Sequence, residues 1–344
     1  MERLIVVNVI SKWHLYCAES FLTSICDVSN HRDRIVVFVL YHSPSSKFRV
    51  KENDSNYIKI IDNNARFCFV EKTKDQVTIL EEEICNNSFS SMVMISPRQM
   101  NLYQVRPTIK IPKKSYILID EGIGNYYSKK LWNLESKALG NQVGFKLFAK
   151  QALKKCYVNI LCRKISRWGL LEKRESEWYV RNDVAEAMWS YFHKFAEKTV
   201  DEEDLFKDGV MYVSDNLSIM TNDPNYEFVY YKSVYEHICQ GEKKTIWFKP
   251  HPNELNRQSF IEQMNSIGFK IFENSNAYED LCNKYSIDTY GLCSTSLLTG
   301  STIFKQNVHS FCDCIDRERL NEYGNRRVEE FRHITANIQD IVRI

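Results

Sequence analysis

The sequence lacks a strong excess of charge of either sign. Its 344 residues include 46 Lys or Arg and 44 Asp or Glu, which leaves a formal net charge of +2. Proteins that bind nucleic acid through their overall charge are strongly basic, so we expect no nucleic-acid partner. The chain is about twice as long as a common domain, and 44% of its residues are hydrophobic, so we expect two folded domains.

Long hydrophobic runs and paired cysteines are also missing. No stretch approaches the roughly 20 apolar residues of a membrane-spanning helix, and the apolar run at residues 4–9 is too short for the core of a signal peptide. The eleven cysteines are odd in number, are scattered from Cys17 to Cys314 and form no C-x-x-C motif, which favours a reducing compartment. These absences predict a cytoplasmic protein.

The chain contains no Asp-x-Asp motif. Carboxylates at that spacing commonly hold the divalent cation that bridges a nucleotide diphosphate. The sequence therefore gives no support to a metal-bridged nucleotide diphosphate, and we expect chemistry that requires neither a metal nor another cofactor.

Apolar runs alternate with helical patterns in the first part of the chain. Residues 4–9 and 34–41 have the buried apolar pattern of strands, and residues 12–25 between them have apolar positions at helical spacing. This β-α-β start predicts an α/β domain over residues 1–200, with a mostly parallel sheet and helices on both faces. Further strands are expected at residues 57–61, 68–70, 91–95 and 116–119.

A second α/β series begins at Gly209 and fills a predicted domain over residues 205–325. Residues 245–249 read as a strand, and residues 288–300 as a strand, a turn and a helix. Residues 326–344 are expected to close the chain as a charged helix. The two halves look like paired Rossmann-like nucleotide-binding domains with a ligand cleft between them. Other elements of this series are expected at residues 227–239, 255–267, 269–272 and 277–284.

The first candidate motif is an acidic turn that follows the apolar run at residues 117–119. It consists of Asp120, Glu121 and Gly122, and Asn125 lies shortly after it. Ligand sites of α/β proteins form at the carboxyl ends of strands, and a carboxylate there can accept a proton from a hydroxyl group. The alternative is an ordinary turn whose acids are solvated.

The second candidate motif places one histidine between two prolines. The run Phe248-Lys249-Pro250-His251-Pro252-Asn253-Glu254 comes at the end of an apolar strand. Each proline fixes its own backbone and restricts the preceding residue, so the direction of the His251 ring is set in advance. A histidine held in this way suits hydrogen bonding or proton transfer to a departing phosphate oxygen. The alternative is a histidine that only bonds a backbone carbonyl in its loop.

The third candidate motif is a turn of small hydroxyl residues. Ser294, Thr295 and Ser296 follow an apolar strand and begin an apolar helix. Hydroxyl and backbone N–H groups at a helix N-terminus bind anions, so this turn predicts a phosphate site. The alternative is simple helix capping by Ser294 or Thr295. The acidic turn, His251 and the phosphate site are expected to meet at the interdomain cleft.

The order of these motifs resembles that of the bacterial sialyltransferases, which carry an acidic turn ending in Gly, a His-Pro pair and a paired Ser/Thr motif. The run Asp-Glu-Gly-Ile-Gly-Asn at residues 120–125 looks most similar to glycosyltransferase family 52, the lipooligosaccharide and capsule sialyltransferases, with the bacterial polysialyltransferases close behind. The resemblance implies a two-domain GT-B fold, a CMP-sialic acid donor bound mainly by the second domain, and inverting transfer without a metal.

The resemblance also implies roles for the motif residues. Asp120 or Glu121 is the expected general base, and His251 is expected to contact the CMP phosphate and assist its departure. Asp215, which follows a strand at the start of the second domain, is a second candidate base, against the alternative of a helix cap. The residues expected to bind substrate are Gly122, Asn125, Lys249, Pro252, Asn253, Ser294, Thr295 and Ser296.

A basic segment at residues 146–174 carries nine Lys or Arg residues and one Glu, interleaved with apolar residues. This pattern reads as an amphipathic helix that docks on an anionic membrane surface, where glycolipid acceptors lie. The alternative is the solvated face of a helix that links the two domains.

The favoured interpretation is a sialyltransferase that adds sialic acid to a terminal sugar, galactose in the first instance, of an oligosaccharide or glycolipid on the bacterial surface. A Kdo transferase, a polysialyltransferase and a glycerophosphotransferase are alternatives with the GT-B fold. A non-catalytic protein that binds a sugar nucleotide ranks behind them, because both the acids and the histidine are present. The linkage and the oligomeric state, monomer or homodimer, stay open.

Overall fold

The protein is divided into two compact units. The computed structural model describes residues 2–26, 34–41, 50, 52–69, 73–97, 102–120, 122–140, 153, 156–162, 165–195, 206, 209–240, 244–272 and 277–344. Unit 1 comprises Met1–Glu121, Val143–Leu170 and Arg181–Ala196, and unit 2 comprises Gly122–Gln142, Leu171–Val180 and Glu197–Ile344. Residues 122–142 and 171–180, which the sequence pattern assigns to the first domain, therefore pack with unit 2.

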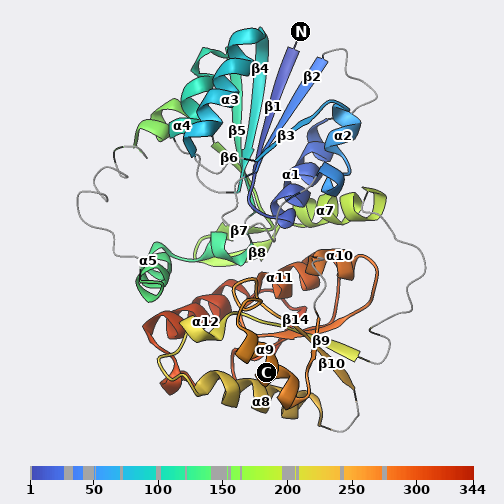
Figure 1. The fold of residues 1–344 in the computed structure, drawn as a ribbon, viewed down its shortest axis with the longest axis vertical. Coiled ribbons are helices and arrows are strands. Elements are labelled where there is room, and N and C mark those ends of the chain that lie inside the picture. Colours follow the sequence, from blue (N-terminus) through green and yellow to red (C-terminus); the bar gives the residue numbers. More distant parts are fainter. Residues whose placement is uncertain are drawn as a thin grey trace. The chain divides into compact units, whose positions relative to one another are not determined.

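Unit 1 is built around a six-stranded, fully parallel sheet (Figure 1). Its strands are β1 (Glu2–Val9), β2 (Arg34–Tyr41), β3 (Arg66–Phe69), β4 (Phe89–Ser96), β5 (Lys113–Ile119) and β6 (Ile165–Trp168). Its helices are α1 (Lys12–Ile25), α2 (Ile58–Ile61), α3 (Thr73–Asn86), α4 (Leu102–Val105) and α7 (Asn182–Phe195), with 3-10 turns η3 (Glu52–Asp54) and η4 (Arg106–Lys110). The strand order is β3-β2-β1-β4-β5-β6, with α1 and α2 on one face and α3 and α4 on the other. The predicted parallel sheet with helices on both faces is confirmed.

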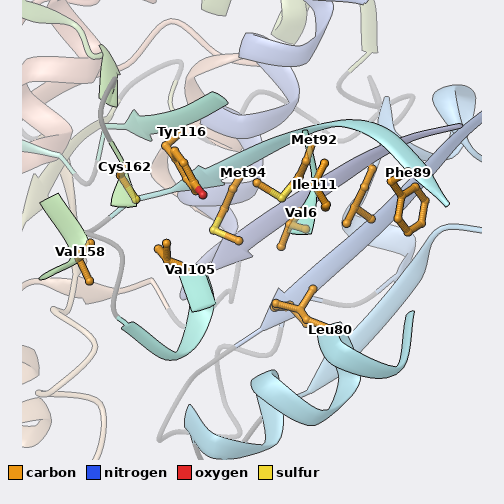
Figure 2. Close-up of a cluster of buried hydrophobic side chains, with 12 residues drawn as sticks. Val6, Leu80, Phe89, Met92, Met94, Val105, Ile111, Tyr116, Val158 and Cys162 are labelled. Carbon is orange, nitrogen blue, oxygen red and sulfur yellow. The ribbon is translucent and has the colours of Figure 1, made fainter. Parts of the chain in front are cut away.

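Strand β1 is apolar along most of its length because both faces of the sheet are covered. Successive side chains of a strand point to opposite faces, so Leu4 and Val6 face one layer of helices and Ile5 and Val7 face the other. All four side chains are fully buried. Figure 2 shows Val6 in a buried cluster with Leu80 of α3. The core of unit 1 therefore lies on both sides of its central strands.

A buried carboxylate explains why α2 is a helix, although the apolar run at residues 57–61 predicts a strand. Glu19 of α1 is fully buried and accepts hydrogen bonds from the backbone N–H groups of Tyr57 (3.0 Å) and Ile58 (2.9 Å). An acceptor for the first N–H groups of a helix stabilises the start of that helix. The predicted strand at this place is wrong, because a distant side chain decides the local structure.

The amphipathic helix predicted for the basic segment at residues 146–174 is wrong for residues 165–168 and 171–174, which form strands. Residues 146–152, 154–155 and 163–164 lie outside the described part of the chain. Residues 156–161 are helical, but β6 pairs with β5, and β7 (Leu171–Arg174) forms a hairpin with the strand that follows it. Trp168 and Leu170 are buried inside the protein and do not offer an apolar face to a membrane. Among the described residues, no helix has the length and apolar character needed to cross a membrane.

Unit 2 repeats the topology of unit 1 with a second six-stranded parallel sheet (Figure 1). Its strands are β9 (Gly209–Val213), β10 (Thr245–Lys249), β11 (Lys270–Ile271), β12 (Asp288–Gly291), β13 (Val308–Ser310) and β14 (Ile341–Arg343), beside the hairpin of β7 and β8 (Glu177–Val180). Its helices are α5 (Lys129–Ala138), α8 (Tyr226–Ile238), α9 (Gln258–Ile267), α10 (Tyr278–Cys282), α11 (Thr295–Thr302) and α12 (Glu322–Ile334), with 3-10 turns η5 (Ile123–Tyr126), η6 (Leu217–Ile219) and η7 (Arg317–Arg319). The strand order is β11-β10-β9-β12-β13-β14, with α8 and α9 on one face and α10 and α11 on the other.

The chain ends in a strand, although residues 326–344 carry the pattern of a charged helix. Helix α12 ends at Ile334, and β14 pairs in parallel with β13 at the edge of the sheet. Only the first of the three residues of β14 is buried. The helix predicted for the residues after Ile334 is therefore wrong. A strand of three residues is too short to show an alternating pattern that distinguishes it from its charged neighbours.

We expect Glu19→Ala to lower the free energy of unfolding by about 3 kcal/mol, because it leaves the hydroxyl of Ser55 and the N–H groups at the start of α2 without an acceptor. Urea unfolding followed by tryptophan fluorescence measures this loss. Glu82→Ala, on the exposed side of α3, is the control and should change the free energy by less than about 0.5 kcal/mol. Equal losses in the two variants would contradict the role given to Glu19.

Candidate active site

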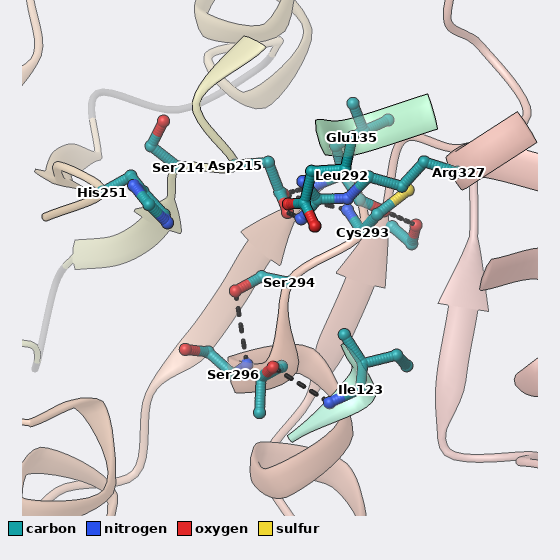
Figure 3. A network of polar contacts seen from close by, with 12 residues as sticks. Ile123, Glu135, Ser214, Asp215, His251, Leu292, Cys293, Ser294, Ser296 and Arg327 are labelled. Carbon is teal, nitrogen blue, oxygen red and sulfur yellow. Dashed lines mark hydrogen bonds and ion pairs between the residues drawn. The ribbon is translucent and has the colours of Figure 1, made fainter. Parts of the chain in front are cut away.

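Three neighbouring strands of unit 2 end at the same edge of its sheet. Strand β9 lies between β10 and β12, and all three run parallel, so the loops that follow them are adjacent. The strand order reverses between β9 and β12, and α/β sheets bind ligands at such a reversal. Ser214 and Asp215 follow β9, His251 follows β10, and residues 294–296 follow β12. Figure 3 shows Asp215, His251 and Ser294 in the same region of unit 2, with hydrogen bonds drawn around Asp215 and around the hydroxyl turn. Two of the predicted motifs therefore come to one edge of the sheet.

The ring of His251 is held by its own turn. Residues 251–254 form a β-turn in which the backbone N–H of Glu254 donates to the His251 carbonyl oxygen (2.8 Å). The Glu254 carboxylate accepts a hydrogen bond from the His251 N–H (2.7 Å), and the ring Nδ1 accepts one from the Asn253 N–H (3.2 Å). Because Nδ1 is an acceptor, the neutral ring carries its proton on Nε2. The alternative of a ring that donates to a loop carbonyl therefore does not hold for Nδ1.

The surroundings of His251 keep its ring neutral. Burial lowers the pKa of His251 to about 4, and the positive charge of Arg327 acts in the same direction. At neutral pH the ring is therefore a hydrogen-bond donor through Nε2. A phosphate bound beside the ring would favour the protonated form, because an opposite charge stabilises it.

Glu254 ends the motif of the Pro-bracketed histidine, but the sequence gives it no role in the site. Its side chain is fully buried. Burial raises the pKa of Glu254 to about 7, while the Ser214 hydroxyl and the His251 N–H favour its charged form. The one signal in the sequence is its place three residues after His251, and acids are common in turns for other reasons.

Asp215 joins the end of β9 to the turn after β12. Its Oδ2 accepts hydrogen bonds from the backbone N–H groups of Leu292 (3.1 Å) and Cys293 (2.9 Å), and its Oδ1 pairs with Arg327 (2.9 Å). Burial raises the pKa of Asp215, whereas Arg327 and the two N–H groups favour the charged form. Both oxygens are engaged, which is the pattern of a positioning residue. A role for Asp215 as a base stays a prediction.

Arg327 is a second residue that sequence patterns do not reveal. It projects from α12, and its guanidinium also donates to the hydroxyl of Tyr323 (3.2 Å). Only 14% of its side chain is exposed. It lies 112 residues beyond Asp215 in an ordinary charged helix, so nothing in the sequence connects the two.

The hydroxyl turn caps α11 and also binds the segment that follows the acidic turn. Ser294 is the N-cap, and its Oγ accepts a hydrogen bond from the Ser296 N–H (3.3 Å). Thr295 Oγ1 accepts one from the Ile123 N–H (3.1 Å), within unit 2. The capping alternative is therefore present in the structure. A hydroxyl that accepts a bond can still donate its own proton, so capping leaves the turn able to bind an anion.

Gly122 is required where its loop meets the hydroxyl turn. Its φ of 106° and ψ of −164° lie in a region that only glycine adopts readily. A Cβ added to Gly122 would lie 2.5 Å from Thr295 Oγ1. Asn125 lies in the 3-10 turn that follows, and its backbone N–H donates to the Gly122 carbonyl (3.1 Å). The end of the acidic motif and the hydroxyl turn are thus in direct contact.

Asp120 is buried at the end of β5 in unit 1, with 1% of its surface exposed. Its Oδ2 accepts a hydrogen bond from the Leu170 N–H (3.0 Å). The alternative of a solvated acid is wrong for Asp120. Glu121 lies outside the described residues. Asp120 belongs to unit 1 and His251 to unit 2, and the prediction that they meet stays a prediction.

The other predicted substrate residues flank the histidine. Lys249 ends β10, and burial lowers the pKa of its ammonium group, while two carboxylates of α10 oppose the shift. Pro252 and Asn253 are exposed. In the part of the chain that the structure describes, no group of three or more His, Cys, Asp or Glu side chains is placed to hold a metal ion. The predicted independence from a metal stays a prediction.

A comparison with known protein families shows to which family the chain belongs. The sequence model of a family described as alpha-2,8-polysialyltransferase matches residues 3–312. The chain belongs to this family. The resemblance to bacterial sialyltransferases is thereby confirmed, and the matching family is the one that stood behind family 52 on the motifs alone. Membership makes the chain a glycosyltransferase of the sialyltransferase class.

Two solved structures share the fold of this family member. A UDP-GlcNAc 2-epimerase from Methanocaldococcus jannaschii is 10% identical with a TM-score of 0.53, and the match covers 100% of this chain and 89% of that one. A sialyltransferase from Photobacterium damsela is 11% identical with a TM-score of 0.50, covering 100% and 81% of the two chains. The predicted GT-B fold of two Rossmann-like units is confirmed. No curated protein sequence matches the chain.

We expect Gly122→Ala to lower the free energy of unfolding by about 2–3 kcal/mol, because its Cβ meets Thr295 and its backbone is strained. Gly140→Ala is the matched control. Gly140 also has a positive φ, of 73°, but nothing lies within 4 Å of the added Cβ, so this variant should lose about 1 kcal/mol. Urea unfolding measures both losses, and equal values would show that the contact with Thr295 is unimportant.

The buried carboxyl of Glu254 should make stability depend on pH. Its pKa of about 7 in the folded protein is above the ordinary 4.5, so the folded state binds more protons between these pH values and stability falls as pH rises through that window. The Gln variant lacks this titration. Relative to wild type, we expect Glu254→Gln to gain up to about 3 kcal/mol between pH 5 and pH 8. Urea unfolding at both pH values tests this, with Glu262→Gln, at an exposed position of α9, as the control. Parallel pH curves for Glu254→Gln and wild type would refute it.

Proposed function

We propose that this family member is an inverting sialyltransferase that takes sialic acid from CMP-sialic acid without a metal. The observation that carries the proposal is the pairing, at one edge of the unit 2 sheet, of a neutral His251 that donates through Nε2 with the hydroxyl turn at residues 294–296. CMP leaves with a single phosphate. Neutral hydrogen-bond donors can stabilise the charge of one phosphate, whereas a diphosphate commonly binds with a divalent cation.

The proposed reaction exchanges one bond at the anomeric carbon of sialic acid. The acceptor oxygen attacks this carbon while its bond to the CMP phosphate oxygen breaks, and the electron pair stays on the phosphate. The Nε2–H of His251 and the hydroxyls of Ser294 and Ser296 donate to the phosphate oxygens as their charge grows. The partial burial of this edge strengthens each hydrogen bond, because less water screens it.

The proton of the acceptor hydroxyl goes to a carboxylate on the opposite side of the sugar. One group cannot serve both faces of an inverting transfer, so the base is distinct from His251. We assign this role to the acidic turn, Asp120 or Glu121. Asp215 is the weaker candidate, because both of its oxygens already hold groups of unit 2.

The acceptor is a sugar hydroxyl of a bacterial surface glycan in this proposal. A terminal galactose of a lipooligosaccharide is one candidate. The family description names an α2,8 linkage, which favours an acceptor that itself ends in sialic acid, as in a sialic acid capsule. Both acceptors offer a hydroxyl to the same base, so the chemistry at His251 is common to them.

Release of CMP from CMP-sialic acid tests the proposed function. We expect release that depends on an acceptor, survives EDTA and falls by about 10²–10³-fold in His251→Ala, because the variant loses one donor to the developing charge. Galactose-terminated and sialylated oligosaccharides are compared as acceptors. His309→Ala is the matched control, because His309 is also a half-buried histidine of unit 2 and stacks on Tyr290 instead.

Other outcomes would overturn separate parts of the proposal. Turnover of CMP-Kdo or CDP-glycerol in place of CMP-sialic acid would show that the donor is wrong and leave the GT-B fold untouched. Loss of activity in EDTA that a divalent cation restores would refute metal independence. Binding of CMP-sialic acid without turnover on any acceptor would favour a non-catalytic protein.

A further inference from the structure

The turn that holds His251 is closed by one buried side chain. Glu254 stands at the last position of the turn, and its backbone N–H donates to the His251 carbonyl oxygen (2.8 Å). Its carboxylate Oε2 accepts a hydrogen bond from the His251 N–H (2.7 Å). Glu254 therefore binds both backbone polar groups of His251.

Packing alone does not account for a carboxyl group at this place. Glu254 is 0% exposed, and its second oxygen, Oε1, has no hydrogen-bond partner among the described residues. A buried carboxyl group with an unmet oxygen costs stability, and an apolar side chain of similar size would avoid that cost. The hydrogen bond that the carboxylate accepts from the His251 N–H links Glu254 to the histidine, and the Ser214 hydroxyl also favours the charged form of Glu254.

Glu254 acts on the imidazole through the backbone of the turn. The conformation of His251 sets the direction of its Cα–Cβ bond, and the Asn253 N–H then fixes the ring through Nδ1 (3.2 Å). Pro250 and Pro252 restrict the backbone, but a proline has no N–H and cannot close the turn by donating a hydrogen bond. The hydrogen bond from the His251 N–H to the turn is thus lost when the Glu254 side chain is replaced.

We infer that Glu254 is a positioning residue, which aims the Nε2–H of His251 at the phosphate of the donor. The inference rests on the proposed function, because the donor phosphate is the target of His251 there. Glu254 touches neither the substrate nor the reacting atoms in this assignment. It keeps His251 in one tautomer and one ring direction.

Three substitutions separate the hydrogen bond from the charge. Glu254→Gln keeps an acceptor oxygen at the same reach, whereas Glu254→Ala removes the acceptor. Glu254→Asp keeps the charge but is one methylene shorter, so its carboxylate is drawn away from the His251 N–H. Glu227→Ala is the matched control, because Glu227 is also a buried carboxylate of unit 2 and accepts from Arg257 (2.9 Å).

Steady-state kinetics with CMP-sialic acid give the first readout. We expect kcat to fall by about 10–100-fold in Glu254→Ala and Glu254→Asp, because a displaced donor stabilises the developing charge poorly. KM for the donor should change by less than about 3-fold, since ground-state binding does not depend on this alignment. Glu254→Gln and Glu227→Ala should both retain kcat within about 3-fold of wild type.

The ring nitrogens of His251 give a second readout that needs no turnover. The chain has eight histidines, and the spectrum of His251→Ala identifies the His251 signals in ¹⁵N-histidine-labelled protein. Wild type, Glu254→Gln and Glu227→Ala should show a neutral ring with its proton on Nε2. Glu254→Asp and Glu254→Ala should show a mixture of tautomers. The Asp variant keeps the test open if the Ala variant does not fold.

Two results would overturn the inference. A single Nε2–H tautomer in folded Glu254→Asp, or a kcat equal to that of wild type in the same variant, would show that Glu254 does not position His251. The nitrogen spectra are independent of the donor. If CMP-sialic acid is not turned over by wild type, the proposed function fails, and the spectra still decide whether Glu254 holds the ring.

Discussion

The buried carboxylate of Asp215 is the interaction on which the rest of the unit 2 site depends. It lies where the strand order reverses, and there it binds the backbone N–H groups at the start of the turn after β12. Its other oxygen brings Arg327 of α12 into the same place. A buried carboxylate is stable only if its charge is met, so the turn and the arginine are fixed together. The position of the hydroxyl turn and the positive charge near His251 both follow from this one side chain.

The positive charge of Arg327, which pairs with Asp215, affects the protonation of the neighbouring histidine. Arg327 adds to the effect of burial on His251, and together they lower its pKa and keep the ring neutral. Burial and the charge of Glu227 raise the pKa of Glu254. The pKa of Glu254 is therefore higher than the pKa of His251, which reverses the ordinary order of a carboxyl group and an imidazole. Such separation is typical of sites that assign distinct roles to neighbouring groups. Here the histidine is left to donate a hydrogen bond, and the glutamate is left to hold it.

The sequence predicts the parts of the fold and the site that depend on local pattern. The buried strands, the Pro-bracketed His251 and the hydroxyl turn are each encoded within a few neighbouring residues. What sequence patterns do not reveal depends on contacts between distant residues. Arg327 sits in an ordinary charged helix 112 residues from Asp215, and the helix at residues 58–61 exists because Glu19, far away in the chain, supplies its first acceptor. The helix predicted for the basic segment is wrong at residues 165–168 for the same reason, because these residues pair as β6 with β5.

The two units share one strand order but use different polar groups at its reversal. In unit 1 the amide of Asn8 on β1 donates to the Ile95 carbonyl of β4 (3.3 Å), and Gln104 donates to the same amide (3.1 Å). Neutral amides hold the strands together there and create little electric field. In unit 2 a carboxylate, Asp215, joins the ends of the corresponding strands and also pairs with Arg327, whose charge acts on the neighbouring histidine. An anionic leaving group needs such a field and a neutral acceptor hydroxyl does not, so this difference favours unit 2 as the site of the donor phosphate.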